Sequence, residues 1–241
     1  MITLYQMPIS HFSEKVRWAL AYKRLPHTFK NLLPGLHART AKKLSGQTAV
    51  PVIKEGRNVV HGSADIISFL DKEFPRFSLT PEDEQEAAQA MEWERWADAE
   101  IGSAVRVLAY SILLDRPDIL KPFMIQDCAW YGRFYIDKAF PKVQSVLRQR
   151  YAINEQNIAS SKAVLKAAAE KQLSAQPDLA TLLPSGFSRA DIALASLWAP
   201  LFRIGKYGIQ WPETMPPEYE AFSTEFADIK AWVEYIYGRY R

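Results

Sequence analysis

Apolar positions follow two different periods along the chain, and the change comes near residue 80. In the first part, short apolar runs alternate with stretches of helical spacing, such as the one through Phe12, Val16, Ala19 and Leu20. The apolar runs predict strands, and the helical spacing predicts amphipathic helices. Strands are expected at 2–5, 28–32, 52–54 and 58–60, and helices after residues 10, 37 and 62. This order, βαβ followed by α and then ββα, predicts a small α/β domain at the N-terminus.

Helical spacing dominates the remainder of the chain, where strand signals fade. Thr80 and Pro81 predict the first helix start, with threonine as the N-cap and proline at the first helical position. Helices are expected over 84–114, from 117 past 135 to an interruption or kink at Pro141, over 157–174, after 188 and over 222–237. We therefore predict an α/β domain over residues 1–75, a linker over 76–82 and an all-helical domain over 83–241.

A capping box marks one helix start in the second half. Ser188 and Asp191 have the S-x-x-D spacing, in which the hydroxyl accepts from the backbone of the third residue and the carboxylate accepts from the serine N–H. The following residues are apolar on every side, including Ile192, Leu194 and Trp198. Such a helix is expected to be buried, so its free N–H groups need partners within the protein. The box therefore predicts a buried central helix.

Composition narrows the classes of function. The 241 residues carry a net charge of +3, with 12 Lys and Arg against 5 Asp and Glu in residues 1–78, and an acidic remainder. The basic residues are dispersed and no nucleic-acid motif is found, so no nucleic-acid partner is expected. The longest apolar run, 192–202, is too short to cross a bilayer, and no signal peptide is read at the N-terminus. Cys128 is the single cysteine, so no internal disulfide and no metal site are expected. We predict a cytoplasmic protein without a membrane partner.

Three short motifs occur in an informative order. Ser10 stands before the first predicted helix and six residues before Val16, Val50-Pro51 precedes the hairpin, and Gly62-Ser63 opens the next predicted helix, where Ser63 is expected to be the cap. With the S-x-A-D-I form of residues 188–192, this pattern resembles the cytosolic glutathione transferase superfamily, in particular its serine-type classes. The resemblance implies a thioredoxin-like domain followed by an all-helical domain, and glutathione as co-substrate.

The resemblance implies a catalytic role for Ser10, whose hydroxyl would donate to the glutathione sulfur and favour the thiolate. A plain helix cap is the alternative role of such a serine. Tyr5, at the end of the first strand, is the second candidate, because other classes use a tyrosine there. Phe12 also lies in the region expected to hold glutathione. Pro51 is expected to be cis, with the backbone of Val50 pairing with the cysteinyl part of glutathione.

One position departs from the family pattern. The superfamily usually has an acid before the serine that binds the γ-glutamyl carboxylate, and that acid contacts the α-amino group. Here Ser63 is present, but Gly62 replaces the acid. The resemblance leaves Asp65, or an acid such as Glu94 or Asp98 from across a dimer interface, as substitutes.

The sequence therefore predicts a homodimeric glutathione transferase that attaches glutathione to a small hydrophobic electrophile, or uses it in isomerisation or peroxide reduction. Tyr110 and nearby aromatic residues are candidates for the electrophile pocket. The alternative is a non-catalytic protein of the same fold that binds a partner or a hydrophobic ligand. The replacement of the acid by Gly62 is the feature that favours this alternative.

Overall fold

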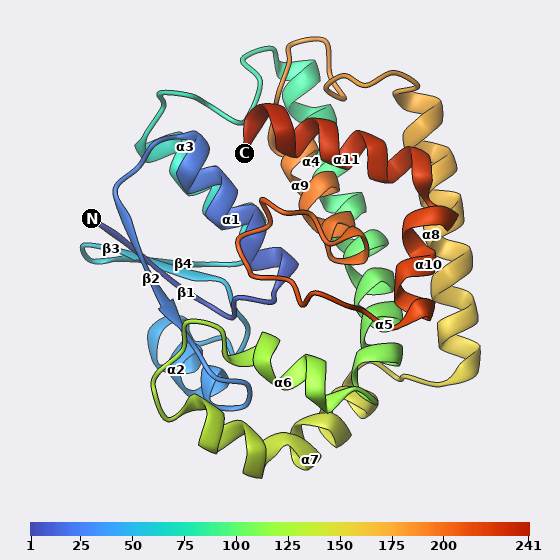
Figure 1. The fold of residues 1–241 in the computed structure, drawn as a ribbon. Helices are drawn as coiled ribbons and strands as arrows, with labels where there is room; N and C mark the ends of the chain where they lie inside the picture. Colours follow the sequence, from blue (N-terminus) through green and yellow to red (C-terminus); the bar gives the residue numbers. More distant parts are fainter.

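A computed structural model describes all 241 residues, with a sheet-containing half followed by a helical half (Figure 1). The elements of the first half are β1 (Ile2–Gln6), α1 (His11–Tyr22), β2 (His27–Asn31), α2 (Leu36–Ser45), β3 (Val52–Glu55), β4 (Asn58–His61) and α3 (Ser63–Glu73). Those of the second are α4 (Glu84–Ala99), α5 (Ile101–Leu113), α6 (Pro117–Ile125), α7 (Gly132–Arg150), α8 (Glu155–Ala175), α9 (Arg189–Trp198), a 3-10 turn η1 (Ala199–Phe202), α10 (Pro217–Glu225) and α11 (Ala227–Tyr240). None of these helices has the length and apolarity needed to span a membrane.

The sheet has the strand order β2-β1-β3-β4. β1 pairs in parallel with β2 and antiparallel with β3, so Leu4 lies between Phe29 and Ile53, and β4 completes the hairpin with β3. Helices α1 and α3 lie on the face of the sheet toward the helical half, and α2 lies on the opposite face (Figure 1). The predicted thioredoxin-like domain followed by an all-helical domain is therefore confirmed.

Helix α9 occupies the centre of the molecule, and all ten of its residues are buried. Its predicted capping box is present: the Asp191 carboxylate accepts from the Ser188 N–H at 2.8 Å, and the Ser188 hydroxyl caps the first turn. Asp191 also accepts from the N–H of Leu182 at 2.7 Å, which fixes the preceding loop. Burial raises the pKa of Asp191 to about 6 in spite of these hydrogen bonds. The box thus provides hydrogen-bond partners for the N–H groups of a helix start that water does not reach.

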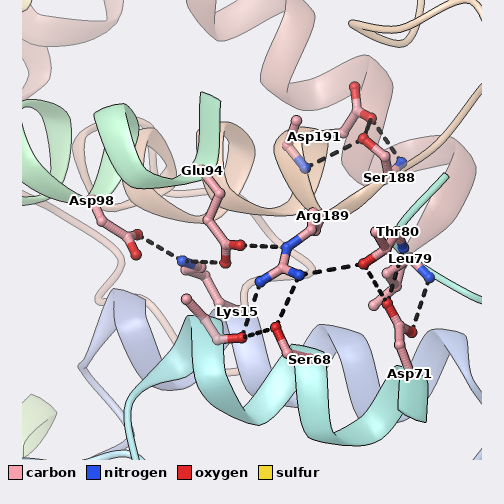
Figure 2. A network of polar contacts seen from close by, with 12 residues as sticks. Lys15, Ser68, Asp71, Leu79, Thr80, Glu94, Asp98, Ser188, Arg189 and Asp191 are labelled. Atoms are coloured by element: carbon pink, nitrogen blue, oxygen red, sulfur yellow. Dashed lines mark hydrogen bonds and ion pairs between the residues drawn. The ribbon is translucent and has the colours of Figure 1, made fainter. Parts of the chain in front are cut away.

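A buried ion network joins the two halves of the chain (Figure 2). Lys15 of α1, with a fully buried side chain, contacts Glu94 at 2.8 Å and Asp98 at 2.6 Å, both on α4. The second oxygen of Glu94 accepts from Arg189 at the start of α9, at 2.5 Å. A charge removed from water is tolerated only with close partners, so these three helices are held in one arrangement.

Arg189 extends this network to the connection between the halves (Figure 2). Its guanidinium donates to the Ser68 hydroxyl and to the Ala64 carbonyl, both on α3. It also donates to the Thr80 hydroxyl at 3.3 Å, and that hydroxyl donates to Asp71 at 2.8 Å. One side chain therefore contacts α3, α4 and the connecting segment.

These contacts explain why the predicted helix start at Thr80 and Pro81 is wrong. The Thr80 hydroxyl and N–H are both bound to Asp71, so the side chain is not free to cap a helix. The helix begins instead at Glu84, and Asp83 caps it by accepting from the Glu86 N–H at 2.9 Å.

Three other predicted helices are divided in the structure. The one over 84–114 bends at Glu100, where α4 ends and α5 begins. Backbone hydrogen bonds continue across the bend, which is why the apolar spacing reads as one helix. The one from 117 ends at Ile125, because Gln126 becomes extended and pairs with the backbone of Gln210; α7 starts at Gly132 and contains Pro141. The last one separates into α10 and α11 at Phe226.

Replacing Glu94 by Gln tests the ion network. Arg189 then loses its only carboxylate partner, and Lys15 keeps Asp98 alone. Breaking a buried pair on one side costs about 3–5 kcal/mol, so the free energy of unfolding in guanidinium chloride should fall by that order. Glu92→Gln, an exposed position on the same helix, is the matched control and should change it by less than about 0.5 kcal/mol. Equal stability of the two variants would contradict the structural importance of the network.

Candidate functional site

A cavity of about 330 Å³ lies between the two halves of the chain. Its N-terminal wall is formed by the segment before and at the start of α1, by Val50-Pro51 and by Gly62-Ser63. The opposite wall is formed by α5, the end of α7, and side chains from the segment 200–219. No Asp or Glu lines the cavity, whereas Arg106 and Arg150 both do. The site is therefore electropositive and largely apolar.

Ser10 is the N-cap of α1 and lines the cavity. Its extended backbone (φ −75°, ψ 120°) lets the hydroxyl oxygen accept from the Ser13 N–H at 3.3 Å. This contact uses one lone pair, and the hydroxyl proton has no partner in the protein. The cap role and the proposed donor role are therefore compatible in one side chain, at the positive end of a helix dipole.

The second and third motifs also line the cavity. The Val50-Pro51 peptide bond is cis, as the resemblance implies. Gly62 donates its N–H to the Pro51 carbonyl at 3.1 Å, which links this turn to the start of α3. Ser63 is buried and is the first residue of α3, next to the free N–H groups of its first turn.

Ser63 is not the cap of α3, so that prediction is wrong. The N-cap is Gly62, with φ +81° and ψ 133°, and no side chain caps the helix. This left-handed region is one that residues with a Cβ rarely adopt, so a side chain here is strained whatever the space around it. The N–H groups of the first turn are consequently left for a ligand, as at other anion sites at helix N-termini.

Several candidate residues lie outside the cavity. Tyr5 is in the middle of the sheet, paired with Lys30 and Val52, and does not line the cavity. Asp65 is exposed in the first turn of α3 and does not line it either. Glu94 and Asp98 are bound to Lys15, which removes both as free partners for an ammonium group across a dimer interface.

The helical wall contains residues that the sequence analysis missed. Tyr110 lines the cavity as expected, and Arg106 lies four residues earlier on the same face of α5. The Arg106 guanidinium is 5.2 Å from the Phe12 ring centroid and 4.9 Å from that of Tyr151, and Tyr110 and Tyr151 are stacked at 5.6 Å. Its spacing of four residues from Tyr110 could have indicated that Arg106 lies on the same face of the helix. No local signal pointed to Arg150, the last residue of α7, or to Tyr151, which follows it.

Tyrosine hydroxyls around the cavity divide into bound and free groups. Tyr207 donates to the Ile9 carbonyl at 3.2 Å, and Tyr219 donates to the Pro200 carbonyl at 2.7 Å. Burial raises the pKa of both, so they remain protonated. Burial also raises the pKa of Tyr110, whose hydroxyl has no hydrogen-bond partner in the protein. Tyr110 is therefore a neutral donor available to a ligand.

His11 is buried in the first turn of α1 and lines the cavity. Burial lowers the pKa of its imidazole well below 6.5, and the positive charges of Arg106 and Lys15 add to the effect. Its Nε2 atom has no partner. His11 is thus neutral at pH 7.

The chain supplies no reactive thiol to the cavity. Cys128 lies in the connection between α6 and α7, outside the lining residues. Burial raises the pKa of its thiol to about 11, which keeps it protonated at neutral pH.

Comparison with known proteins agrees with this geometry. The sequence model of the glutathione S-transferase N-terminal domain matches residues 4–82. This part of the chain is similar to the N-terminal domain of glutathione S-transferases. Comparison with curated protein sequences finds no match.

Solved structures of the same fold cover nearly the whole chain. The β-etherase LigF from Sphingobium sp. strain SYK-6 is 20% identical over 99% of this chain and 95% of its own, with a TM-score of 0.71. A glutathione S-transferase from Methylobacterium radiotolerans, in complex with glutathione sulfonate, is 18% identical over 97% and 90%, with a TM-score of 0.62. The theta class enzyme from Xanthomonas axonopodis pv. citri, with glutathione bound, is 18% identical over 98% and 96%, with a TM-score of 0.60. At these identities the likeness establishes the fold of the chain.

The depressed pKa of His11 predicts a pH dependence of stability. The unfolded chain takes up a proton at this residue below about pH 6.5, whereas the folded protein does not, so stability is present above that pH and is lost as pH falls. Between pH 7 and pH 5 the wild type should lose about 2 kcal/mol more than His11→Gln, measured by denaturant unfolding at each pH. His61→Gln, on the exposed strand β4, serves as the control and should follow the wild type. Parallel curves for all three proteins would contradict the assignment.

Proposed function

We propose that this protein is a serine-type glutathione transferase, in which Ser10 activates the glutathione thiol. The observation that carries the proposal is the convergence of Ser10, the cis Val50-Pro51 turn and Ser63 on one cavity whose remaining walls are apolar and aromatic. A thiol-containing peptide bound to the first group of residues would have its sulfur near a helix N-terminus and facing a pocket for a second substrate.

The chemistry required of Ser10 is modest. A free thiol has a pKa of about 8.5, and the nucleophile is the thiolate. Lowering that pKa by about two units requires about 2.7 kcal/mol of preferential stabilisation of the charged form. A hydrogen bond from the Ser10 hydroxyl, together with the positive end of α1, is of this order. Ser10 would stabilise charge and would not itself form a bond to the substrate.

Glutathione would lie along the N-terminal wall. The γ-glutamyl carboxylate would occupy the start of α3, next to the Ser63 hydroxyl, and the backbone of Val50 would pair with the cysteinyl residue. Solved neighbours of the same fold hold glutathione or glutathione sulfonate, which supports this choice of ligand. Phe12 lies beside Ser10, and its ring packs against Gly102 of α5. We rank Tyr5 and Asp65 below these residues because neither lines the cavity.

The absence of an acid in the cavity favours a second candidate function. With Gly62 in place of the usual acid, the α-amino group of glutathione has no carboxylate partner among the lining residues. A protein of this fold that binds a hydrophobic ligand without turnover is therefore the alternative. A homodimer and a cytoplasmic location stay predictions of the sequence.

Ser10→Ala separates the two functions. We expect calorimetry to show glutathione binding to the wild type and to the variant with similar affinity. Ultraviolet absorbance of the thiolate, followed against pH, should show that the pKa of the bound thiol in the wild type is about two units lower than that of the free thiol. In the variant the pKa of the bound thiol should not be lowered. Turnover with 1-chloro-2,4-dinitrobenzene should fall at least tenfold in kcat/KM.

Ser13→Ala is the matched control for this test. Its hydroxyl is buried three residues further along the same helix, does not line the cavity and has no hydrogen-bond partner. The control should keep both the low thiol pKa and the turnover. Failure of the wild type to bind glutathione would sink the transferase proposal and favour the non-catalytic one.

Ser10→Cys tests the placement of this residue beside the sulfur by a gain of activity. The introduced thiolate, at a helix N-terminus, should attack the glutathione sulfur of a mixed disulfide and release the other thiol. A second glutathione thiolate then attacks the enzyme-bound disulfide and leaves as oxidised glutathione. We expect reduction of the mixed disulfide of glutathione and 2-mercaptoethanol, which the wild type lacks. A folded variant that binds glutathione and shows no such gain would contradict the placement.

A further inference from the structure

Arg106, which is half-buried, differs from the four buried cations of the chain because it has no acidic partner. Lys15, Arg17, Lys23 and Arg189 each contact a carboxylate within 2.8 Å. The Arg106 guanidinium forms no ion pair and no hydrogen bond, and lies between the rings of Phe12 and Tyr151. Cation–π contacts orient a guanidinium but leave its five N–H donors free. A half-buried arginine whose donors are free in this way is available to bind an anion.

A second arginine lies in the same wall. Arg150, the last residue of α7, lines the cavity and has no acidic partner. Burial is the main cause of the lowered pKa of His11 and of His37; the charge of Arg106 adds to it at His11 and that of Arg150 at His37, so both charges act on groups that line the cavity. No carboxylate lines the cavity to offset them. This positive wall faces the site without a counter-ion from the protein.

The surroundings of Arg106 indicate the rest of the ligand. The cavity is lined by six aromatic side chains from the helical half: Tyr110, Phe123, Tyr151, Tyr207, Trp211 and Tyr219. Flat aromatic ligands stack favourably against such rings. Tyr110 adds a protonated hydroxyl without a partner in the protein, which can donate to an ether, nitro or carbonyl oxygen of a ligand.

We propose that the second substrate is an aromatic acid, an electrophile whose ring lies among these side chains and whose carboxylate is bound by Arg106, with Arg150 beside it. The inference rests on the proposed transferase function and goes further by naming the substrate class. Glutathione would use the start of α3 for its γ-glutamyl carboxylate, which leaves Arg106, on the facing helix α5, to the other substrate. Arg106 is then a specificity-determining residue, since the planar guanidinium matches a carboxylate with two parallel hydrogen bonds.

The test compares 4-chloro-3,5-dinitrobenzoate with its methyl ester, which has the same ring and leaving group without the charge. In both, the glutathione thiolate forms a C–S bond to the carbon that carries chlorine, chloride leaves with the bonding electrons, and the thiol proton passes to solvent. In Arg106→Gln we expect kcat/KM for the acid to fall at least tenfold, mainly through a higher KM. The value for the ester should change by less than about threefold, and Arg106→Lys should be intermediate for the acid.

Arg95→Gln is the matched control, because Arg95 is exposed on α4 and does not line the cavity. It should leave both substrates unchanged. Equal losses for acid and ester in Arg106→Gln, with a raised pKa of bound glutathione, would overturn the proposal, since Arg106 would then act on the sulfur. No loss with either substrate would overturn it as well.

A binding experiment without glutathione keeps this inference separate from the proposed function. Calorimetry with the unreactive 3,5-dinitrobenzoate should show binding to the wild type and at least tenfold weaker binding to Arg106→Gln. Methyl 3,5-dinitrobenzoate should bind both proteins alike. This result in a protein that fails to bind glutathione would refute the transferase proposal and support the anion site. Equal binding of acid and ester by the wild type would refute the anion site, whatever the result with glutathione.

Discussion

The arrangement of the whole molecule depends on the buried contact of Lys15 with Glu94, and of Glu94 with Arg189 (Figure 2). These three charged side chains are buried away from water and require fixed partners, because an unpaired charge in this position would destabilise the fold by several kcal/mol. The contact therefore fixes α1 against α4 and the start of α9. Ser10 caps α1, and α4 continues through a bend into α5, so the same contact sets the separation of the two cavity walls.

Close packing between α1 and α5 completes this constraint. A Cβ at Gly102 would lie 2.8 Å from the Phe12 ring, so the two helices meet at a position that admits only glycine without a shift. The Phe12 ring also contacts the guanidinium of Arg106, which lies 5.2 Å from the centroid of the ring. Phe12, two residues after Ser10, therefore packs against α5 and lies beside the guanidinium of Arg106.

The two walls offer different chemistry to a ligand. The N-terminal wall presents backbone donors at the start of α3 and two hydroxyls, those of Ser10 and Ser63. The helical wall presents aromatic rings and arginines, and two of its four tyrosine hydroxyls donate to carbonyls of the chain. With Gly62 in the position of the usual acid, no negative charge lies in the cavity. Both the proposed use of a thiolate and the proposed aromatic acid follow from this positive, partly apolar space.

Local sequence determined the features whose partners lie within a few residues. The Ser188–Asp191 box and the Ser10 cap could be predicted because each closes over three residues, and the positions of the strands followed from short apolar runs. Tertiary structure decided the rest. Thr80 does not cap a helix because its hydroxyl donates to Asp71, nine residues earlier. Arg106 and Tyr151 are in contact only because α5 and the end of α7 pack together. Such contacts depend on which helices, distant in the sequence, pack against each other. Helical spacing of apolar residues identifies the buried face of a helix but does not identify the element that covers it.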